Sequence, residues 1–127
     1  MDEQLDLSRR ERQIMDILYR QEAATVNQIR DGLPDPPAHT AVRTLLSILE
    51  SKGYVRRNKR GRENIYTTRR RRSRAGQSAL QRVLNVFFEG SLEKAVSAHL
   101  SDEKVKLSPD ELLRITELMN QARNRGD

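Results

Sequence analysis

The sequence predicts a mainly helical chain with one short β-hairpin, and three observations support this fold class. Apolar residues recur at spacings of three and four through most of the chain, as on one face of a helix. Between residues 54 and 68 this pattern gives way to two short runs separated by a glycine, as in a hairpin. Prolines and glycines divide the helical pattern into segments of ordinary helix length. The chain of 127 residues has room for one small domain or two very small ones.

The charge distribution indicates where an anionic partner would bind. The net charge is +6, but residues 52–74 carry 11 basic side chains and one acidic side chain. The flanking segments, residues 1–51 and 75–127, are each slightly acidic. A basic segment between two weakly acidic ones is a local electrostatic footprint rather than a general basic character.

The sequence lacks the residues that several classes of protein require. It has no cysteine, so disulfides and thiolate metal sites are excluded. It has no glycine-rich phosphate loop, and its two histidines, His39 and His99, lie in different predicted segments, so we expect no enzyme activity, no metal and no cofactor. The N-terminus has no apolar signal-peptide core, and the longest apolar runs have three residues, against roughly 20 for a membrane span. We therefore expect a cytoplasmic protein without membrane insertion.

The first predicted helix begins at a capping box, Ser8-x-x-Glu11. Its apolar stripe consists of Ile14, Ile17 and Leu18, with Met15 beside it. Its first turn contains Arg9, Arg10 and Arg12, where cations oppose the helix dipole. Contact with phosphate would explain this placement, and the alternative is that these arginines are solvated.

The next two predicted helices are joined by a stiff turn. Thr25-x-x-Gln28 is a second capping box, which opens a short helix over Val26–Leu33. Residues 34–37 are Pro-Asp-Pro-Pro, which cannot continue a helix. A longer helix is predicted over Ala38–Lys52, and Gly53 ends it as a left-handed cap. Two helices joined in this way form a helix-turn-helix pattern.

The helix over Ala38–Lys52 has two different faces. Its apolar face, which we expect in the core, consists of Val42, Leu45, Leu46 and Leu49. Its polar face consists of His39, Thr40, Arg43, Thr44 and Ser47. These side chains suit contact with base edges, and we expect Arg43 to bond a guanine. The alternative for Arg43 is a bond to a phosphate. The alternative is an ordinary amphipathic helix with a solvated face.

A basic hairpin follows this helix. Its strands are predicted over Tyr54–Lys59 and Asn64–Thr68, with Arg60-Gly61-Arg62 at the turn. The side chains expected to contact phosphate are those of Arg57, Lys59, Arg60 and Arg62. A winged helix-turn-helix binds DNA through a helix with an exposed polar face and a basic hairpin that follows it. The alternative is that these charges only prevent aggregation of the hairpin edge.

The rest of the chain is predicted to be a helical dimerisation domain. The run Arg69–Arg72, with Arg74, is interpreted as a linker, so the DNA-binding domain would span residues 1–72 and the dimerisation domain residues 73–127. Helices are predicted from about Gln77, over Leu92–Leu100, and after the capping serine Ser108. These helices are too short to bury their own apolar residues, so we expect a second copy of the chain to cover them. The expected interface consists of Leu80, Val83, Leu84, Phe87, Phe88, Leu92, Val96, Leu112, Ile115, Leu118 and Met119. The alternative is packing onto the N-terminal domain of the same chain.

The assembled motifs resemble the penicillinase and methicillin-resistance repressors, the BlaI/MecI family. The resemblance runs from about Leu7 to Arg123, and its most specific pieces are HTAVRTLLSILESKGYVRR and GRENIYT in that order. It implies a winged-helix domain, a helical dimerisation domain, and a homodimer that represses transcription from an inverted-repeat operator. It also implies that the repressor controls antibiotic-resistance or stress genes and that a membrane sensor protease inactivates it.

Two features depart from the family pattern. Family members that are controlled by a sensor protease are cleaved at an Asn-Phe bond. In this chain Ala98-His99 occupies the aligned position. The copper-responsive relatives carry a cysteine cluster, which this chain lacks. The principal hypothesis is therefore a dimeric DNA-binding repressor of unknown inducing signal. The alternative, from a different class, is a winged-helix module that binds RNA or a protein partner.

Overall fold

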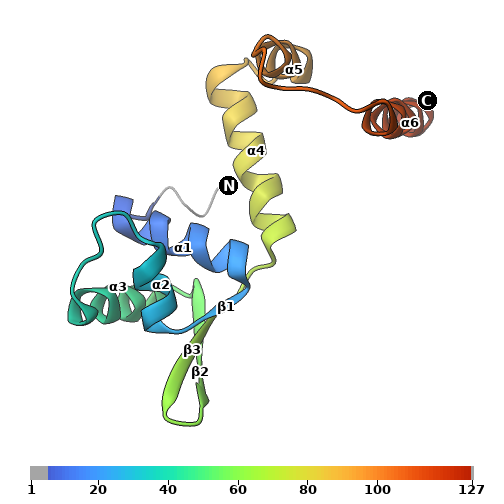
Figure 1. Cartoon of the computed structure of the whole chain (residues 1–127). Helices are drawn as coiled ribbons and strands as arrows, with labels where there is room; N and C mark the ends of the chain where they lie inside the picture. Colours follow the sequence, from blue (N-terminus) through green and yellow to red (C-terminus); the bar gives the residue numbers. More distant parts are fainter. Residues whose placement is uncertain (1–5, 127) are drawn as a thin grey trace. The chain divides into compact units, whose positions relative to one another are not determined.

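The computed structural model describes residues 6–126, which contain six helices and a three-stranded antiparallel sheet (Figure 1). The predicted fold class is thus confirmed. The chain divides into two compact units, Met1–Val83 and Leu84–Asp127. Part of the N-terminal segment examined for a signal peptide, residues 1–5, lies outside the described residues. No helix within the described range combines the length and the apolar character needed to cross a bilayer.

Helix α1 (Arg9–Gln21) begins at the predicted capping box. The Glu11 amide donates to Ser8 Oγ at 3.2 Å, and the Ser8 amide donates to Glu11 Oε1 at 3.2 Å. Four apolar side chains of this helix are buried: Ile14, Met15, Ile17 and Leu18. The predicted stripe is therefore confirmed.

Helices α2 (Val26–Gly32) and α3 (His39–Ser51) form the helix-turn-helix. Each ends within one residue of its predicted bounds, and α2 begins at the predicted Thr25–Gln28 capping box. Ala38 precedes α3 without a side-chain cap. Gly53 has a φ of +85°, which confirms the left-handed conformation expected after the helix.

The sheet contains a strand that the sequence did not reveal. Strand β1 (Ala23–Ala24) pairs with β3 (Glu63–Thr68), which also pairs with β2 (Val55–Arg60), so the order is β1-β3-β2. Two consecutive alanines show no alternation of apolar and polar residues, so periodicity gives no signal for a strand here. Only the distant β3 provides the hydrogen-bonding partners that make this segment a strand.

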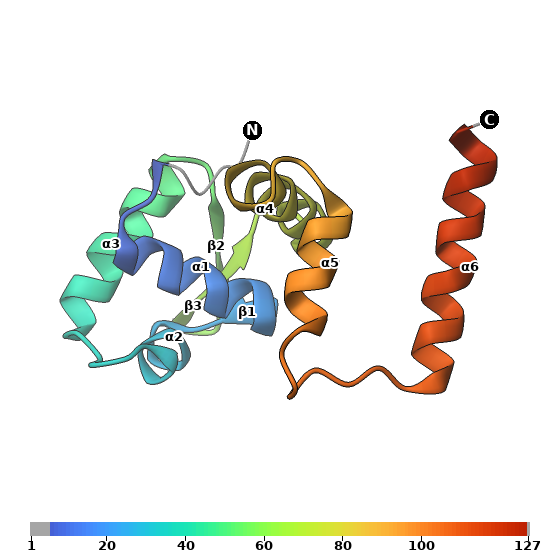
Figure 2. The ribbon, with the colours of Figure 1, turned by 90° about the horizontal axis from the view of Figure 1, so that it is seen from above.

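The core of the first unit lies between helices α1, α2 and α3 and one face of the sheet. Helix α1 packs against β3, and α3 packs against β2 (Figure 2). The largest fully buried side chains are Ile14, Met15, Leu18, Ile29, Val42, Leu46, Leu49 and Val55. This core holds the backs of α2 and α3 and leaves their other faces outward.

The last three helices are α4 (Arg72–Phe87), α5 (Leu92–Leu100) and α6 (Pro109–Gly126). Helices α5 and α6 match their predictions, with Ser91 and Ser108 accepting bonds from the amides of Lys94 and Glu111. The linker interpretation was wrong for Arg72 and Arg74, which lie in the first turn of α4. Arginine favours helices, and repulsion between exposed like charges is weak, so the run does not prevent a helix.

Candidate nucleic-acid interface

Helix α3 presents the predicted polar face to solvent. Val42, Leu46 and Leu49 are fully buried on one side, and Leu45 is half-buried at its edge. On the other side the side chains are exposed, except His39, which is half-buried; the exposed ones are Thr40, Arg43, Thr44 and Ser47. The burial of the leucines therefore determines which side of the helix is accessible to a partner.

Two members of this polar face make bonds within the chain. His39 Nε2 lies within hydrogen-bond distance of Asn27 Oδ1, which connects the start of α3 with α2. Thr44 Oγ1 donates to the carbonyl of Thr40 at 2.9 Å. The Thr44 hydroxyl hydrogen is thus used inside the helix, and its methyl group and oxygen lone pairs remain for a partner.

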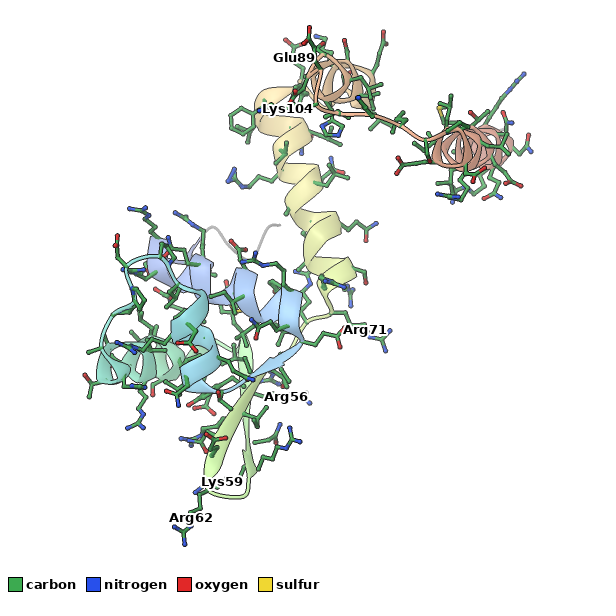
Figure 3. The ribbon with its side chains drawn as sticks, viewed as in Figure 1. Arg56, Lys59, Arg62, Arg71, Glu89 and Lys104 are labelled. Carbon is green, nitrogen blue, oxygen red and sulfur yellow. The ribbon has the colours of Figure 1, made fainter. Side chains whose placement is uncertain are left out.

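The register of the wing places its basic residues on two faces. Side chains that alternate along a strand point to opposite faces, and directly paired residues share a face. Arg57 is paired with the buried Tyr66 and shares the core-side face with Lys59, whereas Arg56 and Arg60 lie on the other face. Figure 3 shows Lys59 and Arg62 near the tip and Arg56 closer to the base of the wing.

The predicted phosphate contacts of the wing therefore do not form one surface. Sequence reasoning also missed Arg56, an exposed member of the outer face. The alternation that starts at the apolar Val55 would have separated the two faces and pointed to Arg56.

The turn of the wing is tighter than predicted. Arg60 pairs with Glu63, so only Gly61 and Arg62 are unpaired, and Arg60 belongs to β2. Gly61 has a φ of +65°, and a glycine at the first of two central positions is typical of a type II′ turn. The short turn places Arg62 at the end of the wing.

One of the predicted DNA contacts has an acidic partner in its own chain. Arg57 Nε lies 3.7 Å from Glu50 Oε2, near the end of α3. Both side chains are substantially exposed, so the pair contributes at most about 1 kcal/mol. The ion pair still joins the wing to α3 and competes with a phosphate for Arg57.

A hollow of about 390 Å³ is lined by residues of both α3 and the wing. Its wall includes Arg43 of α3, Arg62 and Asn64 of the wing, and Asn27 near the start of α2. Two of the predicted contacts, Arg43 and Arg62, therefore border the same concave surface. Sequence reasoning gave no role to Asn27 or Asn64, because their polar side chains carry no charge and fall outside the helical pattern of α3.

A buried carboxylate anchors the opposite end of α3. Glu11 is buried, and Lys52, the residue after α3, donates to its Oε2 at 3.0 Å and to the carbonyl of Asp6 at 2.9 Å. Burial raises the pKa of Glu11, but hydrogen bonds from Ser8 and Lys52, with the charge of Lys52, hold that pKa below its ordinary value. Tyr54 also donates to the Asp6 carboxylate. Among the described residues, no group of side chains could hold a metal ion.

The last helices leave many apolar side chains exposed. No residue of α4, α5 or α6 is buried, and Phe87 and Leu118 are 68% and 62% exposed. Among the predicted interface residues, Leu84, Phe88 and Ile115 are half-buried, and the others are exposed. Val86 and Leu113 are equally exposed but were not predicted, because they lie beside the stripes that we traced.

The helix-turn-helix followed by a β-hairpin is the arrangement of the winged-helix proteins. The fold is similar to that of RosR-S4 from H. salinarum, a protein whose structure was determined in a complex. The TM-score is 0.58, with 22% identity over 78% of this chain and 90% of that one. It is also similar to a mutant MarR from E. coli, whose structure was determined in complex with operator DNA. The TM-score is 0.52, with 16% identity over 93% of this chain and 76% of that one.

The sequence then places the chain within this class. The penicillinase repressor family matches residues 7–121, and the chain belongs to that family. A comparison with curated proteins found no match. The predicted resemblance is therefore confirmed. By its family, the protein is a winged-helix, DNA-binding transcriptional repressor.

Proposed function

We propose that the protein acts as a homodimer that represses transcription by occupying an inverted-repeat operator. The observation that carries this proposal is the two-sided α3, whose leucines are buried while Thr40 and Arg43 remain exposed. A helix held in this way fits the major groove with its first turns toward the bases. Family membership supports the same function.

In this proposal α3 reads the bases and the wing binds the backbone. Arg43 bonds a guanine edge, Thr40 and Thr44 contact bases through oxygen or methyl groups, and His39 and Ser47 flank them. The wing contacts phosphates through Lys59, Arg60 and Arg62, and Arg57 joins them when it leaves Glu50. The hollow that Arg43 and Arg62 share is where one DNA strand passes between helix and wing.

A second copy of the chain completes the proposed regulator. Exposed apolar side chains on α4, α5 and α6 are too numerous for a free surface, and a self-complementary interface covers them. We retain the predicted division into a DNA-binding domain of residues 1–72 and a dimerisation domain of residues 73–127. Two α3 helices would then lie about 34 Å apart on the operator.

We further propose that the controlled genes serve antibiotic resistance or a stress response, with a membrane sensor protease as the partner in induction. Ala98-His99 lies in α5, where the family's cleaved Asn-Phe pair aligns. Cleavage at that bond would therefore need a protease of different specificity. Incubating the repressor with membranes that contain the neighbouring sensor, followed by mass spectrometry of any fragments, tests this route.

Competition binding tests the proposed function as a whole. Footprinting on DNA upstream of the protein's own gene identifies the operator, and the protein is then titrated against operator duplex, random duplex and RNA of equal length. We expect the operator to be preferred by at least roughly a hundredfold at moderate salt. Equal affinity for all duplexes would refute the operator proposal. A preference for RNA would refute it too and would favour the RNA-binding alternative.

A further inference from the structure

The turn between α2 and α3 cannot hold itself together by backbone hydrogen bonds. Residues 34–37 are Pro-Asp-Pro-Pro, so Asp35 supplies the only backbone N–H. In the part of the chain that the structure describes, no backbone–backbone hydrogen bond involves these four residues. Asp35 also has a φ of +45°, a conformation that L residues rarely adopt. The prolines fix φ at three of the four positions, so contacts from outside the turn are needed chiefly to hold the strained Asp35 and the orientation of the turn.

Two arginines supply the missing donors. Arg10 of α1 donates from Nη1 to the Pro34 carbonyl at 2.7 Å and from Nη2 to the Asp35 carbonyl at 2.9 Å. Arg30 of α2 donates from Nε to the Pro37 carbonyl at 2.6 Å. Three of the four carbonyls in the turn thus accept a bond from a guanidinium group. Arg10 therefore has a role within its own chain that the two alternatives considered from the sequence, phosphate contact and a solvated side chain, did not include.

The first turn of α3 depends on this arrangement. Ala38 gives α3 no side-chain cap, and the helix has no buried residue before Val42. Besides the bond between His39 and Asn27 and the packing of α3 on α2, the turn that the arginines hold fixes where α3 starts. Base readout is expected from this same end of the helix. A small rotation of the turn would therefore move Thr40 and Arg43 relative to the bases.

We propose that Arg10 and Arg30 are positioning residues for operator recognition, which act by clamping the turn before α3. This inference rests on the proposed role of α3 in reading bases. Arg10 is suited to the task because its planar fork can serve two adjacent carbonyls at once, which a lysine ammonium does not do with the same geometry. Neither arginine touches DNA in this scheme.

The binding experiment compares Arg10→Ala and Arg10→Lys with Arg20→Ala on operator and random duplexes. Arg20 is the control, because it is an exposed arginine of the same helix and donates to the Asp16 carbonyl of that helix rather than to the turn. We expect Arg10→Ala to weaken operator binding about tenfold and random binding less than about twofold, with an unchanged salt dependence. Arg10→Lys keeps the charge but should restore less than about half of the lost binding free energy, and Arg20→Ala should bind as wild type.

The contrary result is equally specific. If Arg10→Ala weakens both duplexes equally, lowers the salt slope by about 0.9, and is fully rescued by Arg10→Lys, then Arg10 contacts a phosphate and the proposal is overturned.

A second measurement does not involve DNA. Amide hydrogen exchange of the free full-length protein should become faster over residues 39–43 in both Arg10 variants and stay unchanged in the sheet. Unchanged exchange over residues 39–43 would overturn the clamp even if DNA binding were altered. The two proposals can also fail separately. If exchange becomes faster in the Arg10 variants but the wild type shows no preference for its operator, the clamp is supported and the proposed function is refuted.

Discussion

Single side chains in this protein often have a partner in their own chain that limits what they offer to DNA. Arg57 faces Glu50, Thr44 bonds the carbonyl of Thr40, and Arg10 bonds the turn before α3. Arg43 makes no such bond in the described structure and borders the hollow between α3 and the wing. Its guanidinium group therefore has no competing bond within the described structure.

Replacing Arg43 by alanine should reduce discrimination between operator and random duplex by about 1–3 kcal/mol, since a bidentate contact to guanine is lost. Affinity for random duplex should change less than about twofold, as measured by fluorescence anisotropy at fixed salt. Arg20→Ala is the control, because Arg20 is exposed on α1, away from the α3 face. An equal loss on both duplexes would instead assign Arg43 to a phosphate.

Glu11→Gln should lower the free energy of unfolding at pH 7 by roughly 1–2 kcal/mol, because the ion pair with Lys52 is replaced by a weaker hydrogen bond from the ammonium to an uncharged amide. The folded-state pKa of Glu11 lies below its ordinary value of 4.5. The contribution of the charge is therefore complete above about 4.5 and is lost as the pH falls through the folded-state pKa. Urea unfolding of both proteins at several pH values measures this.

The control for this prediction is Asp16→Asn, which changes an exposed acid of the same helix. Its effect should be within about 0.5 kcal/mol at every pH. If the difference between wild type and Glu11→Gln did not shrink at acid pH, the charge of Glu11 would not be the stabilising feature.

The elements behave as units whose bounds depend on short-range signals and whose orientation depends on distant contacts. The wing illustrates both, because its turn is determined by Gly61, whereas its attachment to α3 depends on the buried Val55 and on the packing of β2 against α3. Helix α4 illustrates the limit of charge patterns, since it begins inside the arginine run that we interpreted as a linker.

Two glycine-to-alanine changes should have opposite effects on stability. Gly61→Ala introduces a side chain at a φ of +65° and should cost about 1 kcal/mol. Gly76→Ala in α4 meets open space at an ordinary helical position and should add about 0.5–1 kcal/mol. Thermal and urea unfolding followed by circular dichroism compare the two. A loss of stability in both would show that Gly76 is needed for close packing rather than tolerated.

At the scale of the whole molecule, the two compact units suggest a division of labour. The first has a buried core and an exposed polar helix, whereas the second has apolar faces and no buried residue in its helices. An element with that much exposed apolar surface is stable only with a partner, and a second copy is the partner we propose.

Phe87→Asp should therefore convert dimers to monomers in sedimentation equilibrium, because a buried charge in an apolar interface is costly. Leu118→Asp should do the same from α6, and operator affinity should fall at least about tenfold in both. Lys106→Asp is the control, an exposed charge reversal outside the proposed interface. An unchanged mass for both interface variants would locate the dimer contact elsewhere or leave the protein monomeric.

Much of the fold was predictable from the sequence because the responsible interactions are local. Capping boxes join Ser8 to Glu11 and Thr25 to Gln28, three residues apart, and Gly53 ends its helix without distant help. The alternation of buried and exposed faces on α3 also follows from its own residues. The candidate DNA-binding face could be found in the sequence for the same reason.

The residues alone were enough to predict where α1, α2, α5 and α6 begin, which side of α3 is apolar, and the family to which the chain belongs. Only the tertiary structure decided that Ala23–Ala24 is a strand, that Arg57 faces Glu50, that wing arginines lie on two faces, and that Arg10 holds a turn 24 residues away. The physical reason is range. Capping and periodicity act between residues at most about four positions apart, whereas a guanidinium group bonds whichever carbonyl the folded chain brings within about 3 Å.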